Sequence, residues 1–449
     1  MIFSSINIRE IHNNSKKFKG SNFLTKGFHY KKIIVKNNYK KLNEVANYIS
    51  NIGINNRNYV LNKDFGYPFI SNTILSNNDP STLFKYVSKK LNKNVEGKFI
   101  EENMLLFAGI GSIGDIAFGS KDIIGCLTPL GNVIRVRTIN YPGYFYAFFK
   151  SKIGNALILN LESGSVQTYL DPTTLGNLPV PILPEEKQQQ IHQLIVDSAN
   201  LRVEANKLLK EAVEFFKFLD TTYKAGTYNV KNISSNTINN FKKRFDANYN
   251  IINNYVDNIK SNQKIEFIKI NELTENIFIG PRSKRNYISN GIPFLSTSEM
   301  QKANPTKTEK FVNQNVGKDF QVKEGWLLTT RSGTLGDTIY TLPCINNFAV
   351  SEDAIRIQFK QHSILSNKYV YAFLKSNLGR NSLLAGSYGS VILHLNEDYV
   401  GNVEVPILEK NTIKEIEEKI DLHLFNLNEA IIKENQAINL IENEIDAWQ

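Results

Sequence analysis

The hydrophobic pattern of residues 184–219 predicts one long helix. The stretch contains no glycine and no proline after Pro184, and proline suits the first helical turn because its missing N–H has no intrahelical acceptor there. Apolar or small residues recur at alternating steps of three and four, the pattern of a helix that packs along another helix. These positions are Ile191, Leu194, Ser198, Leu201, Ala205, Leu208, Ala212, Phe215 and Leu219. The pattern therefore indicates a helical partner for this segment.

Residues 412–448 show the same pattern and are the predicted partner. They open with Thr412 and Glu415 in the arrangement of a capping box. Two helices of ~35 residues, at about 1.5 Å per residue, would each extend ~50 Å. Because the first helix leads from one half of the chain into the other, a second helix packed on it has to run antiparallel to it. The second set of seam positions is Ile413, Ile416, Ile420, Leu424, Leu427, Ile431, Glu434, Ile438, Ile441, Ile445 and Trp448.

The two halves of the chain are copies of one another. GYPFIS at Gly66–Ser71 matches GIPFLS at Gly291–Ser296, and YAFFKS at Tyr146–Ser151 matches YAFLKS at Tyr371–Ser376. Both pairs have the same separation along the chain, which is the repeat offset. A repeat of this length indicates a duplicated domain and not a solenoid. In each copy, short apolar runs punctuated by Gly and Pro precede an aromatic, helix-like segment, and a proline-containing extended segment leads into the long helix.

The predicted fold class is therefore α+β, with two duplicated globular domains joined by two long antiparallel coiled-coil helices. The predicted boundaries are residues 1–183 for the first globular domain, 184–224 for the first spacer helix, 225–408 for the second domain and 409–449 for the second spacer helix. At 449 residues the chain exceeds the length at which a single core stops growing, which agrees with more than one domain.

The composition places the chain among globular proteins with a polyanionic partner. Hydrophobic residues make up 41% of the chain, which is too many for a disordered protein. The net charge of +10 favours nucleic acid as the partner, although a codon bias towards Lys and Asn is an alternative explanation of the charge. No apolar run approaches the ~18 residues of a membrane helix, and residues 1–10 lack the pattern of a signal peptide. We therefore expect a cytoplasmic protein without a membrane partner.

Motifs for catalysis are missing from the sequence. Neither the DPPY/NPPY-type nor the glycine-rich motif of S-adenosylmethionine-dependent enzymes occurs, and GxxxxGK[ST] and HExxH are also missing. Cys126 and Cys344 are distant from each other and show no metal-binding spacing. Asp115 and Asp337 lie in glycine-rich turns, which are ordinary strand connections more often than catalytic sites. We predict no catalytic, cofactor-binding or metal-binding residues.

The loops that precede the GYPF and GIPF segments are the predicted contacts with nucleic acid. Residues 280–287 (GPRSKRNY) place three cations and an aromatic ring in one turn-rich loop, and residues 56–59 (NRNY) are the counterpart. Arg and Asn can bond base edges, and Arg and Lys can hold phosphates. A solvated run of charges is the alternative interpretation. The candidate residues are Arg57, Tyr59, Lys63, Arg282, Lys284, Arg285, Tyr287, Lys302 and Arg331.

The order of these features resembles the specificity subunit of type I restriction-modification systems. The resemblance rests on the duplicated globes and on the junctions PVPILPEEKQQQIHQLI and VEVPILEKNTIKEIEEKI. It also rests on the GS turns at 164–167 and 389–392, on SGTLGD at 332–337 and on RFDANY at 244–249. On the residues alone, the Arg244–Asp246 pair favours a structural role at the start of the second copy.

The resemblance implies two target-recognition domains that read the two halves of an asymmetric, bipartite site in double-stranded DNA. It implies that the long helices act as a spacer and as a docking surface for two methyltransferase subunits, and through them for restriction or translocase subunits. Catalysis, with S-adenosylmethionine, Mg²⁺ and ATP, would belong to those partners. An enzyme with an unrecognised active site and a two-globe scaffold outside restriction systems are the alternatives. The helix residues expected to serve this role are Leu194, Leu201, Leu208, Phe215, Leu424, Leu427, Ile431 and Ile438.

Overall fold

The chain folds into two compact units, each built mainly from one copy of the sequence repeat and completed by part of the other copy's long helix. The computed structural model describes residues 25–161, 169–220, 247–263, 265–282, 286–389 and 391–448. Unit 1 consists of residues 1–203 and 429–449, and unit 2 of residues 204–428. Part of each long helix, α6 (Glu185–Glu214) and α14 (Lys410–Asp446), therefore belongs to each unit. No described helix is both long enough and apolar enough to cross a membrane.

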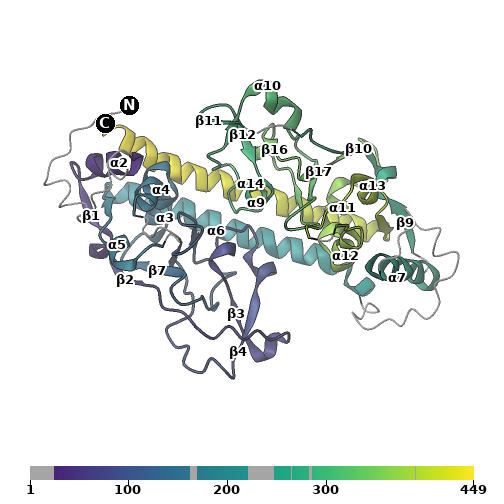
Figure 1. Ribbon diagram of the computed structural model, residues 1–449, viewed down its shortest axis with the longest axis horizontal. Coiled ribbons are helices and arrows are strands. Elements are labelled where there is room, and N and C mark those ends of the chain that lie inside the picture. Colours follow the sequence, from purple (N-terminus) through teal and green to yellow (C-terminus); the bar gives the residue numbers. More distant parts are fainter. Residues whose placement is uncertain are drawn as a thin grey trace. The chain divides into compact units, whose positions relative to one another are not determined.

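The described part of unit 1 is organised around a four-stranded antiparallel sheet in the order β2-β7-β5-β6. Figure 1 labels two of its strands, β2 and β7. Alternate residues of a strand point to opposite faces. Leu105 and Phe107 pack into the core formed with the α3 helix, and Leu106 and Ala108 pack into a second core on the other face. The elements are α2 (Lys26–Ile34), β1 (Tyr39–Lys41), β2 (Ala46–Ser50), β3 (Gly66–Phe69), β4 (Lys85–Ser88), β5 (Leu105–Ala108), β6 (Ile116–Phe118), β7 (Val133–Thr138), α3 (Pro142–Lys150), α4 (Lys152–Leu159), α5 (Pro172–Gly176) and β8 (Pro179–Pro181).

The described part of unit 2 repeats this plan. Its four-stranded antiparallel sheet has the order β10-β17-β14-β15, and a smaller sheet has the order β11-β13-β12-β16. The elements are α7 (Ala247–Gln263), β9 (Glu266–Lys269), α8 (Ile270–Leu273), β10 (Thr274–Ile279), β11 (Tyr287–Ile288), β12 (Ile292–Leu295), α9 (Thr297–Met300), β13 (Phe311–Val312), α10 (Gln314–Gly317), β14 (Leu327–Thr330), β15 (Thr338–Tyr340), β16 (Ala349–Val350), β17 (Ala354–Phe359), α11 (Asn367–Lys375), α12 (Asn377–Ala385), α13 (Glu397–Gly401) and β18 (Glu404–Ile407).

The two units agree down to individual hydrogen bonds. Both central sheets carry a register shift in their first strand, between Ala46 and Tyr48 in β2 and between Thr274 and Asn276 in β10. The hydroxyl of Tyr144 donates to the carbonyl oxygen of Pro181 at 2.7 Å, and the equivalent Tyr369 donates to that of Pro406 at 2.8 Å. The tyrosines thus fasten each aromatic helix to the extended segment before a long helix. The prediction of two duplicated α+β units is confirmed.

A serine ends one helix and begins the next at the same place in both units. In unit 1 the hydroxyl of Ser151 donates to the Phe148 carbonyl at 2.6 Å and accepts from the N–H of Gly154 at 3.1 Å. Ser376 makes the same two bonds in unit 2. Side-chain oxygens at this position satisfy backbone donors that the start of a helix leaves unpaired.

The long helices pair antiparallel within each unit. In unit 1 the Lys433 ammonium lies 3.4 Å from the Asp197 carboxylate, and the Ser198 hydroxyl donates to the Ala430 carbonyl at 2.7 Å. In unit 2 Nδ1 of His423 donates to the Ala205 carbonyl at 2.8 Å, and Lys419 pairs with Glu211 at 2.6 Å. Ser198 and His423 are separated by the repeat offset, as are Ala205 and Ala430, so the two bonds are symmetry equivalents. In both units, later residues of α6 meet earlier residues of α14, as antiparallel packing requires.

The buried stripe of α6 differs from the predicted seam at every second position. Leu194, Leu208 and Phe215 are half-buried, whereas the residues that follow them, Ile195, Leu209 and Phe216, are buried. Leu201 and the following Arg202 are both half-buried. The helix packs on the globular part of each unit as well as on α14, because Ile191 and Ile195 belong to the core of unit 1 and, in unit 2, Phe216 packs on Tyr369 and Phe373. The residues Leu424, Leu427, Ile431 and Ile438 of α14 are buried.

The domain boundaries proposed from the sequence stay a prediction. The compact units divide each long helix between them, and α6 ends at Glu214 and is followed by a 3-10 turn at Lys217–Asp220.

Candidate nucleic-acid interface

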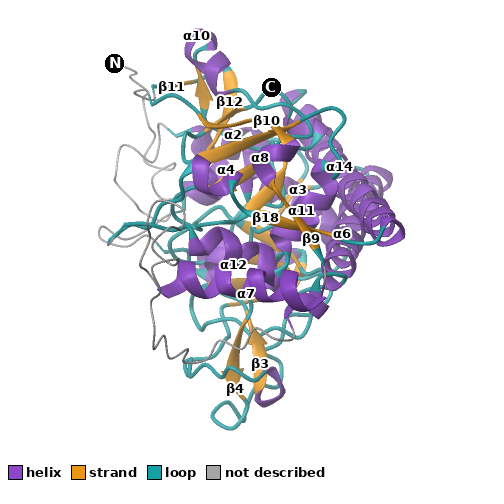
Figure 2. Cartoon of the chain, turned by 90° about the vertical axis from the view of Figure 1, so that its right-hand side faces the viewer, coloured by secondary structure: helices purple, strands orange, loops and turns teal. Residues whose placement is uncertain are grey.

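The hairpin β3–β4 of unit 1 carries an exposed tyrosine with a cation over its ring. The hairpin lies apart from helices α2, α3 and α4 of the same unit in both views (Figures 1 and 2). The ring of Tyr59 packs on the edge of Phe69 with centroids 6.1 Å apart, and the Lys85 ammonium lies 5.0 Å from the Tyr59 centroid. Phe69 is buried, whereas Tyr59 is 50% exposed. The buried ring therefore supports an accessible cation–aromatic pair.

The small sheet of unit 2 carries the same three groups. The ring of Tyr287 packs on buried Phe294 with centroids 5.7 Å apart, and the Lys310 ammonium lies 6.0 Å from the Tyr287 centroid. Phe69 and Phe294 are separated by the repeat offset, and Lys85 and Lys310 are too. The tyrosines also match in pairing, because Tyr59 bridges to Val87 and Tyr287 to Val312, and these valines are again one repeat offset apart. Each unit thus presents an equivalent tyrosine and lysine.

The two surfaces differ in charge. Lys310 pairs with Glu299 at 3.1 Å, and Glu299 also accepts hydrogen bonds from the backbone and hydroxyl of Ser296. Burial acts to raise the pKa of Glu299, but the bonds from Ser296 and the charge of Lys310 outweigh it and hold the pKa below its usual value. The residue at the Glu299 position of unit 1 is Ile74. The equivalent lysines therefore stand in different electrostatic surroundings.

The predicted recognition loops meet these surfaces where the structure describes them. Arg57 and Lys63 are exposed on either side of Tyr59, and backbone bonds from Val60 to Tyr86 and from Ser88 to Asn58 tie this segment to β4. Arg282 is exposed at the end of β10 and Tyr287 begins β11. Lys284 and Arg285 lie outside the described residues. Their contribution stays a prediction.

The two weaker candidates lie on other elements. Lys302 follows α9, and its N–H donates to the Glu299 carbonyl at 3.2 Å. Arg331 follows β14 in the glycine-rich turn, where it is half-buried and its Nε donates to the Leu395 carbonyl at 3.3 Å. This bond joins Arg331 to the segment before α13. The roles of Lys302 and Arg331 in nucleic-acid binding stay predictions.

The glycine-rich turns have a structural explanation. Gly111 and Gly114 in unit 1 have φ of 79° and 98°, and Gly333 and Gly336 in unit 2 have 80° and 76°. Glycine adopts this left-handed region without the steric cost that a side chain brings. Asp115 accepts from the Ser76 hydroxyl at 3.3 Å, and Asp337 pairs with Arg380 at 3.3 Å. Residues 162–168, 221–246 and 390 lie outside the described part of the chain, and with them the GS turn at 164–167, the Arg244–Asp246 pair and Ser390 of the second GS turn.

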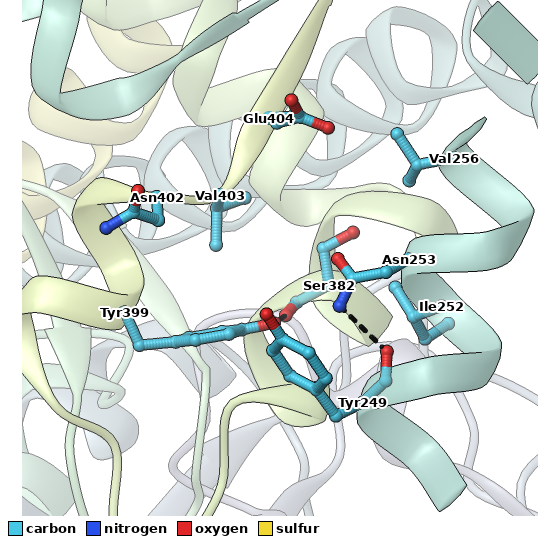
Figure 3. Close-up of a pocket in the computed structure, with 9 residues that line it drawn as sticks. All are labelled: Tyr249, Ile252, Asn253, Val256, Ser382, Tyr399, Asn402, Val403 and Glu404. Atoms are coloured by element: carbon cyan, nitrogen blue, oxygen red, sulfur yellow. Dashed lines mark hydrogen bonds between the residues drawn. The ribbon is translucent and has the colours of Figure 1, made fainter. Parts of the chain in front are cut away.

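A small cavity in unit 2 lies between α7, α12 and the start of β18 (Figure 3). It encloses about 40 Å³, enough for a water molecule and too little for a nucleotide cofactor. The Tyr399 hydroxyl donates to the Ser382 carbonyl at 2.8 Å beside it, and Ser382 Oγ has no hydrogen-bond partner within the described residues. The described residues contain no group of three or more His, Cys, Asp or Glu side chains placed to hold a metal ion.

Sequence reasoning missed a buried arginine in each central sheet. Arg135 of β7 and Arg356 of β17 are fully buried, and burial lowers the pKa of both, that of Arg356 to about 10. Arg135 donates to the Thr128 hydroxyl at 2.7 Å and to the Phe99 carbonyl at 3.4 Å. The signal was available, because VIRV at 133–136 and AIRI at 354–357 each place arginine inside a four-residue run that is otherwise apolar. Lys85 and Lys310 were also missed, although they share the repeat offset.

Comparison with known proteins gives one consistent result. Residues 34–215 match the family model for the type I restriction modification DNA specificity domain. A segment of 146 residues is 24% identical to the specificity subunit of the type I restriction enzyme MjaVIII from Methanocaldococcus jannaschii, and it covers 32% of this chain and 32% of that protein. The chain thus spans about a third of the length of the relative that it matches.

Solved structures of similar subunits also align with the chain. The S subunit of the type I restriction-modification system from M. genitalium aligns over 91% of this chain and 94% of its own, with 13% identity and a TM-score of 0.32. The HsdS subunit from Thermoanaerobacter tengcongensis aligns over 91% and 95%, with 14% identity and a TM-score of 0.28.

Proposed function

We propose that this chain, whose residues 34–215 match the model for the type I restriction modification DNA specificity domain, is the DNA-recognition subunit of a type I restriction-modification complex. In this proposal each unit reads one half of a bipartite site in double-stranded DNA. The chain itself is not catalytic. S-adenosylmethionine, Mg²⁺ and ATP act on partner subunits, which are two methyltransferase subunits and, through them, restriction or translocase subunits.

The repetition of the cation–aromatic surface is the observation that supports this proposal most. Tyr59 with Lys85 and Tyr287 with Lys310 recur at equivalent places in two units whose neighbouring loops differ in sequence. Lysine is suited to phosphate contacts, which position a protein on DNA, whereas the loops can contact base edges. A protein that reads two unlike half-sites needs equivalent contacts with the DNA phosphates in both units and different base-contacting loops in each.

Exposed apolar residues on α14 suit a docking role for this helix. Leu422 is 54% exposed and Phe425 is 62% exposed, although buried positions alternate with them along the helix. Apolar surface of this kind is often covered by a protein partner. The half-buried Leu194, Leu201 and Leu208 of α6 are proposed to contribute to the same role.

Mapping of modified bases tests the proposal directly. The full chain is expressed with its methyltransferase partners in a host without other modification enzymes, and modified positions are read by sequencing genomic DNA. We expect one motif with two unlike specified halves separated by unspecified bases. Replacing residues 225–408 with those of a related chain should change one half of the motif and leave the other intact. A continuous motif, or an exchange that alters both halves, refutes the proposal.

A further inference from the structure

We infer that Arg356 and its counterpart Arg135 are positioning residues that hold the DNA-reading surface of each unit on its central sheet. The inference rests on the proposed function and adds to it the residues that set the geometry of reading.

The guanidinium of Arg356 joins the central sheet of unit 2 to the small sheet. It extends from β17 and donates to the Val350 carbonyl of β16 at 2.6 Å and to the Phe320 carbonyl at 3.3 Å. Further bonds go to the carbonyl oxygens of Ser351 at 3.3 Å and Ala354 at 2.8 Å. Because a guanidinium is planar and its donors are fixed in direction, these bonds set the orientation of the small sheet as well as its distance.

The small sheet links the position of Val350, which Arg356 sets, to the exposed Tyr287. Strand β16 pairs in parallel with β12, where Leu295 is opposite Val350 and Phe294 is opposite Ala349. Phe294 is the buried ring on which Tyr287 packs. A shift of Val350 would therefore move β12 and, with it, the support of the accessible tyrosine.

The same guanidinium lies against the start of the predicted recognition loop. A β-carbon added at Gly280 would lie 3.0 Å from one terminal nitrogen of Arg356 and 3.1 Å from its central carbon. Gly280 is buried, and it is followed by Pro281 and by exposed Arg282. The backbone of the loop thus rests on the arginine, and only glycine fits there without displacing one of the two.

Unit 1 repeats the arrangement with different partners. Arg135 donates to the carbonyl of Phe99, and the pairing of Phe99 with Leu127 matches that of Gln321, next to Phe320, with Ala349. It also donates to the Thr128 hydroxyl, and a β-carbon at Gly53 would collide with the Thr128 carbonyl. Gly53 precedes the segment that holds Arg57 and Tyr59. In unit 2 the arginine itself lies against the start of the loop, whereas in unit 1 Thr128 stands between Arg135 and Gly53.

Stability alone does not account for these residues. A buried charge must lose its hydration, and replacing buried ionic groups with well-packed apolar residues is often neutral or stabilising. The lowered pKa of Arg356, about 10, still leaves the group protonated near neutral pH. An aliphatic side chain could fill this core but could not direct several backbone carbonyls at once.

The deciding variant is Gly280→Ala in the full chain, expressed with its methyltransferase partners. The added methyl group would lie 3.0 to 3.2 Å from the guanidinium, a distance that a small shift relieves, so unit 2 is expected to fold with the loop and the guanidinium displaced by a few tenths of an ångström. We expect one half of the modified motif to relax, with discrimination against substituted bases falling about tenfold at one or more positions. The other half and the melting temperature of the chain should stay as in the parent.

The matched control is Gly401→Ala in the same unit. Its β-carbon would lie 3.3 Å from side-chain atoms of Asn271 and Ile277, a comparably tight fit away from Arg356. This variant should retain the parental motif. Arg356→Lys, which keeps the charge without the planar fork, should relax the same half as Gly280→Ala, and Arg135→Lys the opposite half.

The outcomes separate this inference from the proposed function. An unchanged motif for Gly280→Ala, equal relaxation of both halves, or the same relaxation for Gly401→Ala overturns the positioning role. If the parental chain itself gives no bipartite motif, the proposed function fails first. Loss of discrimination with an unchanged melting temperature is a result that a merely stabilising role would not produce.

Discussion

Removing one partner of the buried ion pair between the long helices should strongly destabilise unit 1. Nη2 of Arg202 lies 2.9 Å from Oε2 of Glu434, and the side chain of Glu434 is 1% exposed while that of Arg202 is 14% exposed. The Tyr146 hydroxyl also donates to Glu434 at 3.3 Å. Arg202→Leu would leave a buried carboxylate without its cation, at a cost of ~3–5 kcal/mol.

The symmetry of the helix pair predicts how to repair this loss. The residues one repeat offset away from Arg202 and Glu434 are Leu427 and Leu209, and both leucines are buried in unit 2. The chain therefore accommodates an apolar pair at the equivalent layer. The double variant Arg202→Leu with Glu434→Leu should recover most of the stability, and adding Tyr146→Phe should remove the polar group that remains unpaired.

Differential scanning calorimetry of the full chain measures both effects. For a unit of this size, ~3–5 kcal/mol corresponds to a fall in melting temperature of roughly 6–20 °C. The single variant should lower the transition of unit 1 by this amount, and the double variant should return it to within a few degrees. An unchanged transition for Arg202→Leu, or a double variant as unstable as the single one, would refute the reasoning.

Three further results are expected. Lys85→Ala and Lys310→Ala should each weaken binding of the assembled complex to all DNA sequences alike. In titrations at several salt concentrations, each variant should reduce the slope of log affinity against log salt concentration by about 0.9, whereas relaxed specificity would assign the lysine to base reading. Leu209→Asp should lower the melting temperature much more than Leu208→Asp, because Leu209 is buried and its neighbour is half-buried, and equal effects would contradict the described stripe of α6. Burial raises the pKa of the Cys126 thiol from 9.0 to about 12, so the unfolded chain loses this proton at a lower pH than the folded chain does. The contribution of Cys126 to the free energy of unfolding should therefore fall as the pH rises from about 9, and urea titrations that show the same fall in Cys126→Ala would contradict this.

The register of the helix seam shows the limit of a one-dimensional pattern. Adjacent residues at 194 and 195, 208 and 209, and 215 and 216 are both apolar in each case, so hydrophobicity cannot choose between them. Neighbouring positions on a helix differ by about 100° in direction, and both border the same face. The choice depends on which other elements pack against the helix, and these include residues far along the chain, such as Tyr369 and Phe373.

The sequence indicated the loops of the candidate interface but not the lysines that strand pairing brings to them. Arg57, Tyr59, Arg282 and Tyr287 are predicted contacts because cations and aromatic residues cluster locally in the sequence, and their role stays a prediction. Lys85 lies far from Tyr59 in the chain and reaches it because Phe69 pairs with Lys85 in the β3–β4 ladder. Contacts set by strand register leave no local signal in the sequence.

The sequence by itself determined the duplication, the α+β class, the existence of both long helices and their antiparallel direction. These features follow from periodicity, from repeated segments and from the connectivity of one chain, which are all properties of residue order. The tertiary structure alone decided which face of α6 is buried, which lysines lie over the tyrosines, and that Arg135 and Arg356 lie inside the sheets. Those features depend on which residues, far apart in the sequence, cover a side chain and exclude water from it. That is decided only when all layers of a unit pack together.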